Sequence, residues 1–160
     1  MNKTIFFVAN LTVTGHGKTI FSQPDLAKAL KAVAAARYAT FEVGDFAFLT
    51  RPDGPKRPNT IFKVGDPVSF RLRIHGLKRV NKTIFFVANL TVTGHGKTIF
   101  SQPDLAKSNK PIPSKGFPVG HIKGTIHLPK VPGTYIAHFK IVDRHATRSL
   151  DFDQAIVVQP

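Results

Sequence analysis

The sequence predicts an all-β protein built from two packed antiparallel sheets. Residues that favour strands are abundant, including 14 phenylalanines, whereas the helix-favouring residue glutamate occurs once, at Glu42. Twelve prolines and twelve glycines divide the 160 residues into short segments. Several of these segments alternate apolar and polar residues, most clearly residues 68–75, which is the pattern of a strand with one buried face.

One segment of the chain occurs twice without a single difference, at residues 2–28 and again at residues 81–107. The identity ends abruptly, since Ala29 follows the first copy and Ser108 follows the second. Surface substitutions usually change stability by less than about 0.5 kcal/mol, so independent drift would have altered some exposed positions. The duplication is therefore recent or engineered, and we expect the first copy to be an addition to an older domain.

Residues 1–39 are expected to form a strand, a turn and a second strand, followed by a short helix. The strands are expected at residues 3–13 and 18–22, around a turn that contains two glycines. A helix is expected after Pro24, because proline is favourable in a first helical turn and alanines follow it. In the second copy the same PDLAK letters lead into a proline-containing segment, which excludes a helix. We therefore expect identical residues to adopt two structures.

Residues 40–160 are expected to form one sandwich domain, in which turn signals separate seven or eight strands. Gly44 and Asp45 are expected to form a bulge or bend, and three prolines make residues 51–58 a loop. A long polar, proline-containing loop is expected to follow the second copy and to end at about residue 119. The expected strands are residues 40–43, 46–49, 68–75, 83–93, 97–101, 121–128, 135–142 and 149–158.

Three stretches of this domain resemble a known family. They are FKVGDPVSFRLRI at residues 62–74, ANLTVTGHGKTIF at residues 88–100 and GTIHLPKVPGTYIAHFKIVDRHATRSLDFDQAIVV at residues 124–158. Their succession is similar to an immunoglobulin-like β-sandwich of secreted bacterial proteins: a Gly-Asp-Pro turn leads the second strand, and Tyr135 followed by Asp143 resembles the penultimate strand with its tyrosine. The resemblance covers residues 40–158 and implies an accessory, adhesive or spacer module. The cysteine pair and core tryptophan of antibody domains are missing from the sequence, so antibody-like recognition is not implied.

The chain is strongly basic, with 23 Lys and Arg against 9 Asp and Glu and a formal net charge of +14. Such a charge attracts nucleic acid, acidic polysaccharide, anionic lipid or an acidic protein surface. Two interpretations stay open, a solvated basic surface and a polyanion-binding site. Most phenylalanines fall on inward positions, which disfavours single-strand binding by stacking. The candidate polyanion-binding residues lie in the loop before residues 68–75, on the exposed face of that strand and shortly after it: Lys56, Arg57, Arg71, Arg73, Lys78, Arg79 and Lys82.

Catalytic, cofactor and metal sites are not predicted. The sequence has no cysteine, which excludes disulfides, cysteine-ligated metals and thiol nucleophiles. The GHGKT letters of each copy lack the first glycine of a phosphate loop, since Thr12 and Thr91 stand there, and are expected to form hairpin turns. Most of the histidines, His75 among them, are expected to face solvent, and His127 and His138, on strands expected to pair, are the best couple for a metal. A set such as Ser149, His145 and Asp143 has no nucleophile turn or oxyanion loop beside it.

These observations favour a non-enzymatic accessory or protein-interaction module. The two copies compete for one position in a sheet, and we expect residues 81–107 to hold it because they keep connections on both sides. Residues 2–28 are then expected to add to an exposed sheet edge, to exchange with another molecule or to remain mobile, and a dimer is favoured over a monomer. No apolar run approaches the roughly 20 residues of a membrane span. The opening apolar segment is interrupted at Asn10, so a secretory leader is not predicted, although an extracellular or periplasmic parent is compatible with the fold.

Overall fold

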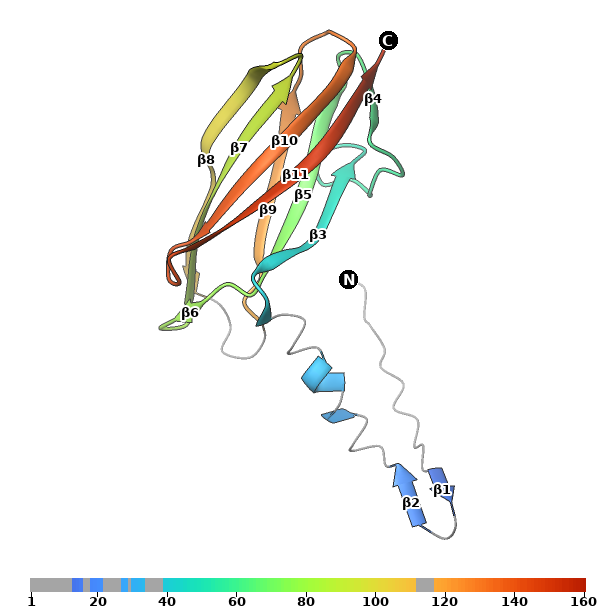
Figure 1. Cartoon of the computed structure of the whole chain (residues 1–160), viewed down its shortest axis with the longest axis vertical. Coiled ribbons are helices and arrows are strands. Elements are labelled where there is room, and N and C mark those ends of the chain that lie inside the picture. Colours follow the sequence, from blue (N-terminus) through green and yellow to red (C-terminus); the bar gives the residue numbers. More distant parts are fainter. Residues whose placement is uncertain (1–12, 16–17, 22–26, 29, 34–38, 112–116) are drawn as a thin grey trace. The chain divides into compact units, whose positions relative to one another are not determined.

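The computed structural model describes residues 13–15, 18–21, 27–28, 30–33, 39–111 and 117–160 (Figure 1). The chain divides into two units, Met1–Arg37 and Tyr38–Pro160. The all-β prediction is confirmed, because most of the described residues lie in strands. In the described ranges, no helix has the length and apolar character needed to cross a membrane. Most of the expected strand at residues 3–13 and the helix-starting Pro24 lie outside the described residues.

The first unit contains a hairpin of β1 (Val13–Gly15) and β2 (Lys18–Phe21), and residues 27–28 and 30–33 are helical. The hairpin pairs Val13 with Phe21, Thr14 with Thr19 and Gly15 with Lys18, with a register shift after the valine. In the second copy the corresponding residues pair in the same way, with the same register shift: Val92 with Phe100, Thr93 with Thr98 and Gly94 with Lys97. The register of this hairpin is therefore set by its own residues.

The second unit is a sandwich of two sheets, which lie one behind the other in Figure 1. The larger sheet has the order β4-β11-β10-β7-β6, with β8 also on β7, and the smaller sheet has the order β3-β5-β9. Neighbouring strands are antiparallel except β4, which runs parallel to β11. The strands are β3 (Glu42–Leu49), β4 (Ile61–Lys63), β5 (Pro67–His75), β6 (Arg79–Val80), β7 (Thr83–Gly94), β8 (Lys97–Pro111), β9 (Gly120–His127), β10 (Gly133–Asp143) and β11 (Arg148–Gln159).

The core lies between the two sheets and is built from the predicted alternation. β5 buries Val68, Phe70, Leu72 and Ile74, and β10 buries Tyr135, Ala137, Phe139 and Ile141. The two faces meet at Phe70 and Phe139, whose ring centroids are 5.2 Å apart in an edge-to-face arrangement. Full burial of one large apolar side chain stabilises the fold by roughly 1.5–3 kcal/mol. The one-sided alternation predicted for residues 68–75 is confirmed, and β10 has the same pattern.

The second copy forms β7 and β8, and β7 pairs with β10 in the larger sheet. The strand expected at residues 97–101 is longer than predicted, because β8 continues to Pro111 and includes the first residues of the expected loop. A bulge makes this possible: Asp104 adopts a φ of 51° and donates its N–H to Asn89 Oδ1 at 2.9 Å, which carries the strand past Pro103. Beyond the bulge Ala106 and Lys107 are extended, whereas the same letters at residues 27–28 are helical. The expectation that identical residues adopt two structures is confirmed.

Asp143, at the end of β10, is fully buried and holds three segments together. Its carboxylate accepts the N–H groups of His145 and Ala146 in the following turn, and the N–H of Lys78 at 2.8 Å. Arg148 completes the network, with its Nη2 3.2 Å from Asp143 Oδ2 and donating also to the carbonyl of Gly76. The carboxylate thus joins the β10–β11 turn to the segment that leaves β5.

We expect Asp143→Asn to lower the free energy of unfolding by about 3 kcal/mol, because the new amide presents a donor to N–H groups and leaves Arg148 without its carboxylate. Urea denaturation measures the change. Asp151→Asn, on an exposed position of β11, is the matched control and should change stability by less than about 0.5 kcal/mol. Equal stability of the two variants would show that the network is dispensable.

Candidate anion-binding face

The outer face of the smaller sheet carries four nitrogen-rich side chains from two neighbouring strands. Alternation on β5 turns Arg71 and Arg73 outward, and alternation on β9 does the same for His121 and Lys123. The antiparallel register places Arg73 opposite His121 and Arg71 opposite Lys123. Residues in such positions have Cβ atoms about 4.5–5.5 Å apart, so the four side chains form a two-by-two group. We call Arg71, Arg73, His121 and Lys123 the basic array.

Two carboxylates lie at the edge of the basic array, the half-buried Asp45 and the exposed Asp53. Asp45 is opposite Arg73 in register, and its Oδ2 is 3.9 Å from Arg71 Nη2. Asp53 forms an ion pair with Lys123, and its side chain is 72% exposed. Exposed pairs of this kind contribute only about 0–1 kcal/mol. They leave the array open to competition by an incoming anion.

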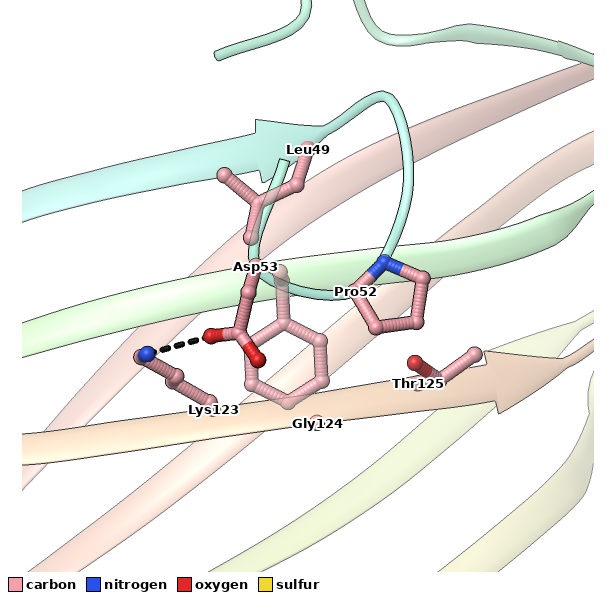
Figure 2. Close-up of a pocket in the computed structure, with 7 residues that line it drawn as sticks. Leu49, Pro52, Asp53, Lys123, Gly124 and Thr125 are labelled. Atoms are coloured by element: carbon pink, nitrogen blue, oxygen red, sulfur yellow. Dashed lines mark hydrogen bonds and ion pairs between the residues drawn. The ribbon is translucent and has the colours of Figure 1, made fainter. Parts of the chain in front are cut away.

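A shallow pocket adjoins the array on the same face (Figure 2). Figure 2 shows Asp53, on the loop after β3, reaching toward Lys123 of β9, with Pro52 and Thr125 on the other side of the pocket. Gly124 allows β9 to lie close over the core, because a Cβ atom there would be 2.8 Å from Phe70 Cζ. The pocket therefore combines a charged rim with a floor that admits no larger side chain at residue 124.

His121 reports the electrostatic character of this face. Its pKa lies below the ordinary value of 6.5, first because it is partly removed from water and then because Arg73, Lys123 and His75 are positively charged or can become so. The unfolded chain binds this proton more readily than the folded chain, so protonation of His121 lowers stability as the pH falls below 6.5. The face thus disfavours a further positive charge.

His75 is not solvent-facing as expected, since it is only 4% exposed. The cause is the predicted bulge, which is confirmed: the register between β3 and β5 shifts between Val43 and Asp45. At this bulge Gly44 lies directly on the imidazole, and a Cβ atom on Gly44 would come within 1.9 Å of His75 Cε1. The backbone of an edge strand therefore covers a position that alternation alone assigns to solvent.

The structure separates the seven basic residues singled out from the sequence. Arg71 and Arg73 belong to the array, and Lys56 is an exposed residue beside the end of β3. Arg57 has a structural role, because its guanidinium lies 4.3 Å from the centroid of the Phe62 ring and donates to the Ile61 carbonyl. The remaining three lie before and within the β6–β7 hairpin, which belongs to the larger sheet: Lys78, Arg79 and Lys82.

The expected pairing of the strands that carry His127 and His138 is wrong, because β9 and β10 belong to different sheets. His138 instead lies between Asp153, at 2.8 Å from its Nδ1, and Thr93, at 3.0 Å from its Nε2. These two hydrogen bonds orient the His138 ring. The three groups follow the hydroxyl–imidazole–carboxylate order of a catalytic triad, but acyl transfer would also need hydrogen-bond donors for an oxyanion. Among the described residues, no three His, Cys, Asp or Glu side chains are grouped to hold a metal ion.

The set Ser149, His145 and Asp143 is not arranged as a triad. Asp143 accepts backbone N–H groups, and His145 Nε2 lies 3.3 Å from the hydroxyl of Thr83. Sequence reasoning missed His121 and Lys123 as partners of Arg71 and Arg73. Alternation placed both outward, but their neighbours follow from the pairing of β5 with β9, which the sequence does not state.

No protein-family model and no curated protein sequence matches the chain. Among solved structures, the chain is similar to the alkylpurine DNA glycosylase AlkC of Pseudomonas fluorescens bound to DNA with an abasic-site analog, at 12% identity and a TM-score of 0.49. That likeness covers 83% of this chain and 34% of the glycosylase, so the chain spans about a third of that protein. It is also similar to the superoxide reductase (neelaredoxin) of Ignicoccus hospitalis, at 16% identity and a TM-score of 0.41, covering 85% and 93% of the two chains. Likenesses at these scores carry no inference about function.

Replacing Arg73 by Gln is expected to raise the pKa of His121 toward 6.5, because Arg73 is the largest cause of the lowered pKa after burial, and burial itself remains. NMR titration of the histidine ring protons measures the change. Lys130→Gln, in the exposed turn after β9, removes one positive charge elsewhere and should leave the pKa of His121 unaltered. A pKa at or above 6.5 in the unaltered chain would contradict the assignment of an electropositive face.

Proposed function

We propose that this chain is a non-enzymatic accessory or protein-interaction module of the immunoglobulin-like type, in a rearranged or engineered form. In this proposal the N-terminal copy supplies a second β7–β8 hairpin, which exchanges with another molecule and gives a dimer. The observation that carries it is the identical register of the two hairpins, including the register shift after the valine. The N-terminal segment already forms the residue pairs of the β7–β8 hairpin, so it can occupy the β7–β8 position in the sheet of another molecule.

The immunoglobulin-like part of the proposal is supported by strand order and by Tyr135. The sheets β3-β5-β9 and β11-β10-β7-β8 follow the order of a seven-stranded sandwich with a strand switched to the second sheet. The Tyr135 hydroxyl donates to the carbonyl of Val131, four residues upstream, at 2.7 Å. A tyrosine near the start of the penultimate strand that bonds back to the upstream backbone is typical of this class.

The exchange follows from what β7 does in the sandwich. β7 pairs with β10 from Phe86 to Gly94 and buries side chains such as Leu90 and Val92. Residues 7–15 carry the same letters in the same order, so they can present the same side chains to the β10 of a second molecule. Because each molecule carries both copies, the exchange can be mutual, and a symmetric dimer results.

Light scattering is expected to give a dimer for the full chain and a folded monomer for a variant without residues 1–28. Thr19→Pro is a finer test, since it removes the N–H of a paired residue in β2, whereas Thr19→Ala keeps it and should remain dimeric. If the full chain and the truncated variant are both monomeric and equally stable, strand exchange does not occur.

The basic array supports a second candidate function, the binding of a polyanion. It places two guanidinium groups, a lysine and an imidazole on one sheet face, in a chain whose formal net charge is +14. In this second candidate function, the sandwich binds an acidic polymer mainly through the positive charge of the protein.

Retention of the full chain on immobilised heparin or DNA is expected to weaken steeply as salt rises, because counterions compete with each contact. The salt needed for elution is the measurement. A near-neutral β-sandwich of similar size serves as the control and should not be retained. If the chain is not retained at low salt, the polyanion-binding function is wrong, whereas the proposal of a protein-interaction module is not affected.

A further inference from the structure

We propose that the basic array is a binding site for the sulfate groups of an acidic polysaccharide, and that protonation of His121 strengthens the binding. The proposal rests on the polyanion candidate and deepens it, since it names the residues, the chemical class of the ligand and the control by pH. It adds His121 and Lys123, of β9, to Arg71 and Arg73, of β5.

The arrangement of the array is costly without a ligand. Like charges directly opposite each other on neighbouring strands destabilise a sheet, yet Arg71 faces Lys123 and Arg73 faces the imidazole of His121. The counter-charges are the half-buried Asp45 and the exposed Asp53, whose ion pairs contribute little. An anion above the array would relieve this repulsion, and the planar guanidinium groups match tetrahedral oxyanions through paired N–H donors.

The shape of the face favours a polysaccharide over a single-stranded nucleic acid. The array lies on a three-stranded sheet, where successive outward side chains of β5 are about 6.6–6.8 Å apart. The described residues that line the face and its pocket include no exposed aromatic ring on which a base could stack. A flexible chain with closely spaced anionic groups can follow such a face without stacking and without a groove to fill.

Binding of the sulfate groups is coupled to protonation of the His121 imidazole. The groups that face it are Arg73 and His75 on β5 and Lys123 on its own strand, with Arg71, Asp45 and Asp53 further across the face. In the free protein the pKa of His121 is lowered by burial first and by these positive charges next. A bound sulfate adds negative charge beside the ring and raises its pKa, so the complex holds this proton more tightly than the free protein. Binding therefore tightens as the pH falls from about 8 to about 5, the range in which histidine titrates.

The residues are tested on heparin with two charge-matched double variants of the full chain. Arg71→Gln with Arg73→Gln is expected to lower heparin affinity about tenfold or more, since charge-assisted bonds are lost. Lys130→Gln with Arg144→Gln removes the same charge from exposed turns and should have a clearly smaller effect. Thermal unfolding checks that both double variants fold. If the Arg71→Gln, Arg73→Gln variant does not fold, the single variant Arg73→Gln, at an exposed position, replaces it in the heparin measurement.

Equal losses in the two double variants would overturn the array as the site while leaving nonspecific polyanion binding in place. If heparin does not retain the unaltered chain, both the array as a binding site and the polyanion-binding function are wrong. A DNA duplex of matched charge, tested in parallel, distinguishes the ligand class. Binding to the duplex as tight as to heparin would overturn the assignment to a polysaccharide.

The pH dependence is tested with a matched pair of histidines on β9. Heparin affinity of the unaltered chain is expected to rise as the pH falls, and His127→Gln should keep most of that rise, because His127 lies opposite Pro67 and away from the array. His121→Gln should lose most of it. The same rise in both variants would show that His121 does not control binding.

Discussion

The buried carboxylate of Asp143 is the interaction on which the assembly of the sandwich depends. It continues the alternation of β10, so the register that buries Tyr135, Phe139 and Ile141 also carries Asp143 inside. A buried charge has to be satisfied, and the N–H of Lys78, two N–H groups of the next turn and Arg148 satisfy it. Because these donors come from the β10–β11 turn and from the segment between β5 and β6, one residue fixes the turn and the exit of β5 together.

Comparison of the two copies of the duplicated segment distinguishes structure set by neighbouring residues in the chain from structure set by tertiary contacts. The hairpin around the glycine turn has one register in both copies, since turn residues and immediate neighbours decide it. The Ala-Lys letters after the shared proline do not behave in this way. They are helical where alanines follow and extended where β7 offers a partner, because a strand makes its backbone hydrogen bonds with a neighbouring strand whereas a helix makes them within its own segment.

The smaller sheet combines a tightly closed end with an open, charged one. At Gly44 the backbone closes on His75, and at Gly124 β9 closes on Phe70, so neither position tolerates a larger side chain. Between them the basic array stays exposed to solvent. The pairing of β5 with β9 sets which of its four side chains lie opposite each other.

The sequence by itself determined the all-β class, the alternation of β5 and β10, the hairpin turn and the bulge at Gly44, because each depends on residues close together in the chain. β4 and β6 are too short to show a period. Only the tertiary structure decided that β8 runs to Pro111, that His75 is buried, that His127 and His138 lie in different sheets, and that Arg71 and Arg73 meet Lys123 and His121. All four depend on which strands become neighbours, and that choice is made by the packing of the whole core.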